Sequence, residues 1–387
     1  MLSIVFVTAW NLSQRRGGER NRVFGLANAV SKMANAIVLH QGPNMRIGGT
    51  RFLHYDPLLK RDRCDSLVMN LTNYYASPLE ASISHLIQSL PLTKDTDIIQ
   101  VEQCFPFFPA FRARNSVDRD ITLSLDIHSI HPPLPKPRLM GNLLYSTYRV
   151  ASSLYARSAE SFAVKRSNII LSVSPEEARL LKELYGLRNV HVVPNGVDVG
   201  MFEASSARKW HEARDNVVFF HGSLSWYPNV EATDFILDYI APKMEKSTFI
   251  ICGPNPTPTF LKKIARSKNV KYLGYADRLP EYIKGSDLCI APLVSGGGSK
   301  LKILEFAAAG RPIVATKKAV EGLPFIDKYN ALLFDRIDDE FVDGMKKALS
   351  DEKLRSQIGG NALRTAQQHD WHRIAQNLLR EYKGALC

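Results

Sequence analysis

The sequence predicts an α/β protein made of two doubly wound domains, each with a parallel sheet covered by helices. Its 387 residues exceed what one ordinary hydrophobic core holds. Short apolar, β-branched runs alternate with stretches of helical period along the whole chain, which indicates βαβ units. The alternation stops at Asn195-Gly196 and begins again at Val217. We therefore expect a first domain over residues 1–195 and a second domain over residues 196–370.

The strands of both domains are expected where buried, β-branched runs occur. In the first domain these runs are 3–8, 36–40, 97–102, 121–128, 169–174 and 190–196, with stretches of helical period between them, as at 21–33 and 175–186. In the second domain they are 217–223, 247–253, 270–275, 288–293, 312–316 and 331–335. Ligands of such sheets bind beyond the carboxyl ends of the strands, so functional residues are expected just after these runs.

The composition indicates a protein of a reducing compartment with an acidic partner. Five cysteines are scattered without a C-x-x-C pair, which fits free thiols better than disulfides or a zinc site. The chain opens on a strand-like segment without the charged start of a signal peptide, and it has no run of about 18 apolar residues. The net charge of +12 suits phosphorylated substrates, nucleic acid or an anionic membrane, although a basic surface kept for solubility explains it too. The scattered cysteines and the strand-like opening lead us to expect a cytoplasmic protein. No nucleic-acid-binding motif is present, so no nucleic acid partner is expected.

A basic, aromatic stretch in the first domain suggests contact with a membrane. It follows the proline-rich segment 131–140 and has helical spacing over 141–166, with Glu160 as its sole acidic residue. Such a helix can lie on an anionic surface, which would place the protein at the inner face of the membrane. A domain helix that buries a stripe of Leu and Tyr explains the pattern equally well. The basic residues concerned are Lys136, Arg138, Arg149, Arg157, Lys165 and Arg166.

A glycine pair follows the first strand. Gly17 and Gly18 stand among arginines, directly before the helical pattern that contains Arg22. Glycines at this place let main-chain N–H groups approach a phosphate or a sugar at the positive end of a helix. Tight turns between strands and helices also use glycine for steric reasons, and the pair is not a G-x-G-x-x-G fingerprint.

The strongest signal lies in the second domain, where a strand, a glycine loop and a helix follow one another. Gly296, Gly297, Gly298 and Ser299 lead into a helix that opens near Lys300, which predicts a cradle for a diphosphate. Lysines at positions 300 and 302 can neutralise its charge, and Glu305 can accept hydrogen bonds from two ribose hydroxyls. A mobile loop beside a solvated helix is the alternative.

The segment GGGSKLKILEFAAAGRPIVAT, followed by EGL, resembles the donor-site signature of the retaining family-4 glycosyltransferases. The segments SVSPEEARLLKELYGLRNVHVVPNGVD, VVFFHGSLSWYPN and FIICGPNP resemble further parts of that family in the expected order. HDWHRIAQNLLREY resembles its C-terminal helix, which implies that residues 371–387 cross back to the first domain. The resemblance implies the GT-B fold, with two Rossmann-like domains facing a cleft, the first for the acceptor and the second for the nucleotide sugar.

Carried over position by position, the resemblance implies roles for individual residues. His128 would face the donor sugar beside Asp126, Gly18 would face the reacting centre, and Lys302 would stabilise the leaving group. The implied donor-binding residues are Gly17, Arg22, Asn195, Gly222, Ser223, Gly253, Gly296, Gly297, Gly298, Ser299, Lys300 and Glu305.

Two positions depart from the family pattern. Gly297 stands where many relatives have a glutamate, and Ser223 and Pro228-Asn229 stand near the places of an Arg–Lys pair. Lys302, with Lys300 or Arg22, is expected to supply the missing charge. These departures leave the identity of the donor sugar open.

The resemblance implies a metal-independent transfer of a hexose from a UDP- or GDP-linked donor, with retention, to a glycan, lipid-linked or other hydroxyl acceptor. No cofactor is expected, and no D-x-D motif is placed to hold a divalent ion beside a diphosphate. One alternative is a nucleotide-sugar 2-epimerase of the same fold, which would need carboxylates such as Glu102 or Asp126 for proton transfer. Another is an inactive partner subunit that binds a sugar nucleotide.

Overall fold

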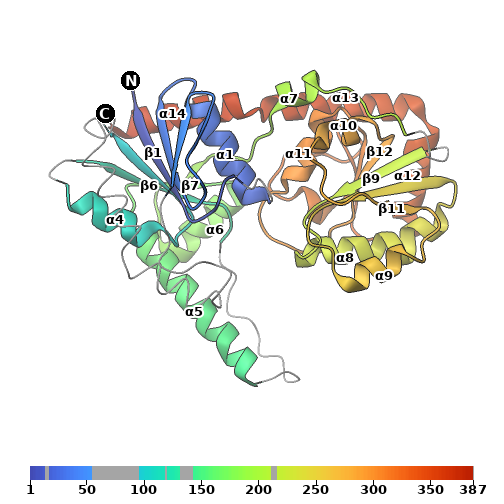
Figure 1. The fold of residues 1–387 in the computed structure, drawn as a ribbon, viewed down its shortest axis with the longest axis horizontal. Helices are drawn as coiled ribbons and strands as arrows, with labels where there is room; N and C mark the ends of the chain where they lie inside the picture. Colours follow the sequence, from blue (N-terminus) through green and yellow to red (C-terminus); the bar gives the residue numbers. More distant parts are fainter. Residues whose placement is uncertain (14–16, 55–95, 118–119, 131–142, 211–215, 387) are drawn as a thin grey trace. The chain divides into compact units, whose positions relative to one another are not determined.

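The computed structural model describes residues 1–13, 17–54, 96–117, 120–130, 143–210 and 216–386. It divides into two compact units. The first comprises 1–15, 19–194 and 374–387, and the second comprises 16–18 and 195–373. Each unit has its own sheet, which helices flank (Figure 1). The predicted fold class is therefore confirmed.

The sheet of the first unit has the strand order β3-β4-β2-β1-β5-β6-β7-β8. All neighbouring strands are parallel except β3 and β4, which form an antiparallel pair that the sequence patterns did not predict. The order reverses direction between β1 and β5, so their carboxyl ends border the place where such sheets bind ligands. The strands are β1 Ser3–Thr8, β2 Asn35–His40, β3 Met45–Ile47, β4 Thr50–His54, β5 Ile98–Glu102, β6 Thr122–Ile127, β7 Ile169–Ser172 and β8 His191–Val192.

In the described part of the chain, five helices belong to this unit in whole or in part. The last of them, α14, starts in the second unit, and from Ile374 onward its residues belong to the first. Its Tyr382 is fully buried and binds side chains of β5 and β6, so the predicted return of the C-terminal helix is confirmed. The helices are α1 Gly18–Val30, α4 Phe107–Asn115, α5 Leu143–Arg166, α6 Pro175–Tyr185 and α14 Trp371–Leu386.

The second unit has a parallel sheet with the order β11-β10-β9-β12-β13-β14. The reversal lies between β9 and β12. Its strands are β9 Asn216–His221, β10 Ser247–Cys252, β11 Val270–Tyr272, β12 Leu288–Ala291, β13 Ile313–Thr316 and β14 Leu332–Phe334. Its helices are α7 Val199–Ala204, α8 Tyr227–Phe235, α9 Pro258–Ile264, α10 Leu279–Lys284, α11 Leu301–Ala308, α12 Asp339–Ser350 and α13 Glu352–Gln368.

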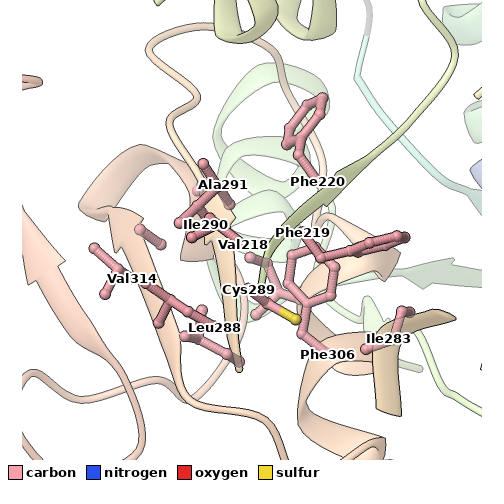
Figure 2. Close-up of a cluster of buried hydrophobic side chains, with 14 of the residues drawn as sticks. Val218, Phe219, Phe220, Ile283, Leu288, Cys289, Ile290, Ala291, Phe306 and Val314 are labelled. Carbon is pink, nitrogen blue, oxygen red and sulfur yellow. The ribbon is translucent and has the colours of Figure 1, made fainter. Parts of the chain in front are cut away.

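The core of the second unit fixes the orientation of α11. Phe306 on this helix is fully buried and meets the ring of Phe219 on β9 edge-on, with 6.4 Å between ring centroids (Figure 2). Ile303 and Leu304 are also fully buried. Burial of such side chains stabilises the packing by about 1.5–3 kcal/mol each. The rotation of α11 about its axis is thereby set, and with it the directions of its polar residues.

Candidate functional site

The predicted donor residues of the second unit gather at the carboxyl ends of β9, β10 and β12. Gly222 and Ser223 follow β9, Gly253 follows β10, and residues 292–300 connect β12 to α11. This is the edge of the sheet at its topological switch point, where α/β sheets bind their ligands.

Two glycines at this edge are required by a close approach of two loops. A Cβ atom added at Gly253 would lie 1.8 Å from the main-chain oxygen of Gly222. A Cβ at Gly222 would lie 2.5 Å from the side-chain nitrogen of Asn229. A larger residue at Gly253 would have to move the backbone, and one at Gly222 would have to displace the Asn229 side chain.

The glycine loop between β12 and α11 is held in one shape by the residues around it. Gly296 and Gly298 have φ angles of +96° and +67°, which favour glycine. The Lys300 ammonium donates hydrogen bonds to both of their carbonyl oxygens, at 3.1 and 2.6 Å. Asn195 donates to the Ser299 hydroxyl at 2.7 Å. Lys300, expected to neutralise a ligand's charge, is thus engaged with the loop itself, whereas a Cβ at Gly297 would meet open space.

Lys302 is a second buried lysine of this site. Its side chain is 7% exposed, its ammonium donates to the side-chain oxygen of Asn229 at 2.6 Å, and it lies 4.3 Å from the centroid of the Phe220 ring. Burial lowers the pKa of Lys302 to about 7, while Glu305 opposes this shift and Lys300 adds to it. A lysine in this state gains much from an anionic ligand, because the ligand would supply the charge partner that the site lacks.

Glu305 lies one turn further along α11, at the surface of the same site. Its carboxylate is partly exposed and lies 3.1 Å from Nε2 of His221 at the end of β9, without the alignment of a hydrogen bond. The His221 ring meets Phe306 edge-on, which holds the histidine in place. A carboxylate next to such a ring retains acceptor capacity for ligand hydroxyls.

Three residues of this edge were missed by the sequence analysis. His221 and Asn229 contact the predicted residues Glu305 and Lys302, and Glu231 on α8 accepts a hydrogen bond from the Ser295 hydroxyl at the start of the glycine loop. A carboxylate therefore stands beside the loop although Gly297 carries none. The position of His221 at the carboxyl end of β9 was the available signal, whereas Asn229 lies in the first turn of α8.

The first unit places a network of four buried charges at the ends of β5 and β6. Arg22 on α1 forms a bidentate ion pair with Asp126 at 2.9–3.0 Å and also donates to the main-chain oxygens of Val193 and Pro194. Nε2 of His128 lies 2.7 Å from Glu102 and 3.6 Å from Asp126. Arg22 is 1% exposed, and these contacts hold its guanidinium inside the first unit.

His128 is cationic at neutral pH in this setting. Burial would lower its pKa, but Asp126 and Glu102 outweigh this and raise the pKa to about 9. Its Nδ1 has no hydrogen-bond partner among the described residues. Burial and the nearby Asp126 raise the pKa of Glu102, whereas Arg22 and His128 overcome burial and lower that of Asp126.

Glu102, Asp126 and His128 form the one set of three side chains, in the described part of the chain, that is close enough to share a metal ion. Arg22 and a protonated His128 already balance the two carboxylates, and Asp126 accepts hydrogen bonds from Nε and Nη2 of the guanidinium. The donor set is therefore satisfied by protein cations, and the residues do not fit a metal site.

The remaining predicted residues, Gly17 and Gly18, group with the second unit. Gly17 has a φ of +122°, and Gly18 opens α1. The first unit has a cavity of about 90 Å³, which is lined by Trp10, Glu19, Glu102, Phe105 and Ser129 among others. The pocket lies at the switch point between β1 and β5.

The helix α5 carries part of the predicted membrane contact. Lys136 and Arg138 lie outside the described residues, as does the side chain of Arg149. Lys165 and Arg166 are exposed, although the Arg166 guanidinium stacks on Phe162 at 4.0 Å. Within the described ranges, no helix is both long and apolar enough to span a bilayer.

Comparisons with known proteins agree with this architecture. Residues 215–351 match the family model described as glycosyl transferases group 1, and residues 50–200 match that of glycosyltransferase family 4. A D-inositol 3-phosphate glycosyltransferase of Jonesia denitrificans is 25% identical over 252 residues, which span 58% of this chain and 58% of that protein. The curated relatives are thus matched over little more than half of their length.

Solved structures are similar over the full length. HepE of Anabaena, solved with UDP and glucose, has a TM-score of 0.70 at 16% identity and covers 99% of this chain, with all of its own chain covered. Sucrose-phosphate synthase from Thermosynechococcus elongatus has a TM-score of 0.75 at 14% identity, with 100% and 99% covered. At these identities the likeness establishes a common fold.

Proposed function

Because the chain belongs to the group 1 and family 4 glycosyltransferases and has their GT-B fold, we propose that it transfers a hexose from a nucleoside-diphosphate sugar. The proposed acceptor is a hydroxyl group of a glycan or of a lipid-linked molecule, and the anomeric configuration is retained. One observation carries this proposal. The buried Lys302 and the partly exposed Glu305 lie one turn apart on α11, at the switch point of the second sheet.

The donor is proposed to bind with its diphosphate at the glycine loop. Main-chain N–H groups of the loop and of the first turn of α11 can donate to phosphate oxygens, and Lys302 would supply positive charge. Glu305 would accept hydrogen bonds from the ribose hydroxyls. The close approach of Gly222 and Gly253 supports this, because it leaves the strand ends free of side chains where a nucleotide would lie. UDP and GDP are the proposed nucleotides, and HepE was solved with the first of them.

His128 of the first unit is proposed to act at the sugar, and Gly18 at the reacting centre. A protonated His128, with Nε2 bound to Glu102, has its Nδ1–H left to donate to a sugar oxygen. The bond from the anomeric carbon to the phosphate oxygen breaks as the acceptor oxygen bonds to that carbon from the same face. The acceptor's proton passes to the departing phosphate oxygen, so no dedicated base is needed. Lys302 and the loop N–H groups stabilise the charge that develops on the leaving group.

An epimerase of the same fold finds less support in the site. Both carboxylates that it would use are engaged: Asp126 by Arg22, and Glu102 on both of its oxygens, by Gln100 and His128. Incubation with the donor alone separates the two functions, because an epimerase would produce the epimeric nucleotide sugar without any acceptor.

The proposed function is tested first by donor binding. A panel of UDP-, GDP- and dTDP-sugars is added to the wild type and to the Glu305→Ala variant, and the melting temperature is measured. A ligand at one hundred times its Kd should stabilise the wild type by about 2.7 kcal/mol. Stabilisation by one nucleotide that is weakened in the variant supports the proposal. Equal stabilisation of both proteins would place the nucleotide elsewhere, and no stabilisation by any sugar would contradict donor binding.

A further inference from the structure

A continuous chain of buried hydrogen bonds connects the C-terminal helix to His128. The Tyr382 hydroxyl on α14 lies 2.6 Å from Oε1 of Gln100, and Nε2 of Gln100 donates to Oε1 of Glu102 at 2.8 Å. The other carboxylate oxygen of Glu102 lies 2.7 Å from Nε2 of His128. Tyr382 and Gln100 are fully buried, and Glu102 is 1% exposed. All members belong to the first unit.

The chemistry of these groups sets the direction of each bond. An ionised Glu102 can only accept, so the amide NH₂ of Gln100 faces it and the amide oxygen faces Tyr382. The phenol must then donate to that oxygen, and its second neighbour, the Ser124 hydroxyl at 3.0 Å, donates to the phenol. Glu102 thus receives one hydrogen bond on each oxygen, which favours its charged form.

We propose that Tyr382 and Gln100 are positioning residues for His128. By holding the Glu102 carboxylate charged and in one orientation, they keep the proton on Nε2 of the histidine and leave Nδ1 as its ligand-facing atom. The part played by His128 at a donor sugar rests on the proposed function, whereas the connection itself does not. The C-terminal helix therefore determines the state of a histidine more than 250 residues away in the sequence.

The charged groups around His128 lie on three elements of the first unit. Glu102 on β5 and Asp126 on β6 are the carboxylates, and Arg22 on α1 forms an ion pair with Asp126. Burial raises the pKa of Tyr382 well above its ordinary value, so the phenol stays protonated and remains a donor. Loss of the Tyr382 hydroxyl would free the Gln100 amide to rotate and turn its oxygen toward Glu102. Without the hydrogen bond from Gln100, the Glu102 carboxylate holds a proton more readily and stabilises the His128 imidazolium less.

The test is the titration of His128 in the full chain labelled with ¹⁵N-histidine. Long-range ¹H–¹⁵N spectra report the tautomer and the midpoint of each ring, and His128→Asn assigns the signal. The wild type should show a proton on Nε2 and a midpoint well above that of the exposed histidines. In Tyr382→Phe and in Gln100→Leu the midpoint should fall by about half to one pH unit.

Two matched variants separate this effect from general loosening. Ser124→Ala removes the hydrogen bond of Tyr382 that does not lead to Glu102, and Tyr185→Phe removes a tyrosine–carboxylate contact with Glu160 in the same unit. Both should leave the His128 midpoint unchanged. An unmoved midpoint in Gln100→Leu, or an equal shift in Ser124→Ala, would overturn the proposal even if Tyr382→Phe fails to fold. Because no sugar is present, failure of the transferase proposal would be seen separately, in the donor-binding panel.

Discussion

The lowered pKa of Lys302 predicts that the affinity for a nucleoside diphosphate falls steeply above neutral pH. In the protein without ligand, Lys302 has a pKa of about 7, because burial penalises its charged form. An anionic diphosphate favours the ammonium, so binding takes up a proton wherever the free lysine is neutral. Affinity is therefore full well below pH 7 and is lost as the pH rises through the pKa of the unbound side chain.

The size of the effect follows from the protonated fraction. With a pKa of about 7, half of the molecules carry the ammonium at pH 7 and about one in a hundred at pH 9. The Kd should rise about 50-fold over this range, or about 2.3 kcal/mol. A lysine with an ordinary pKa near 10.4 would change the Kd by only about 4%. The second phosphate ionisation, near pH 6, is complete over this interval and adds little.

Isothermal titration calorimetry with UDP, or with GDP if that is the nucleotide that stabilises the protein, measures the change. Runs at each pH in buffers of different ionisation enthalpy count the protons taken up. Binding of the nucleotide without its sugar avoids a contribution from His128, which is expected to face the hexose. Lys302→Met should bind weakly with little pH dependence, while Glu305→Gln should keep the slope of the wild type. A Kd that stays constant from pH 7 to 9, without proton uptake, would refute the assignment of Lys302 to the diphosphate.

Further outcomes are expected at other sites. Glu305→Ala should raise the donor Kd at least about tenfold, since one hydrogen bond to a carboxylate is worth about 1.5–3 kcal/mol, with an unchanged circular dichroism spectrum; an unaltered Kd would remove the ribose role. Gly253→Ala should lower the free energy of unfolding in urea by about 2–4 kcal/mol, because its Cβ would clash with Gly222, whereas Gly297→Ala should change it by no more than about 0.5 kcal/mol; equal effects would contradict the close approach of the loops. Turnover should persist in EDTA; a loss of turnover in EDTA that Mg²⁺ restores would show a metal requirement. Anionic vesicles should co-sediment the protein at low salt and release it at high salt, and negligible binding to anionic vesicles would favour a soluble acceptor.

The fold was predictable because its signals are local. Each expected strand run overlaps an observed strand, since buried parallel strands show as short β-branched runs whatever their partners are. The β3–β4 pair was missed because β3 has three residues, too few for a periodic pattern. The one local signal of this pair was the glycine at position 48, where the turn has a φ of +57°.

The site was predictable in position but not in its contacts. Sequence placed Lys300 and Lys302 together as charges for a diphosphate, yet the first binds loop carbonyls and the second is buried against Asn229. Which way a side chain points depends on helix rotation, and Phe306 sets that rotation through a strand more than 80 residues earlier. The contacts of Arg22 with Asp126 and Pro194 are equally remote in sequence, so no local pattern could separate a structural arginine from a phosphate ligand.

Cleavage of the donor tests the central claim most directly. The purified chain is incubated in EDTA with UDP- and GDP-hexoses and a mixture of glycan and lipid-linked acceptors, and the anomeric proton signals are followed by NMR. We predict that one donor loses its nucleoside diphosphate, that the product keeps the anomeric configuration of that donor, and that Glu305→Ala slows the reaction. An inverted product, an epimeric nucleotide sugar, or no cleavage of any donor that the protein binds would contradict the account.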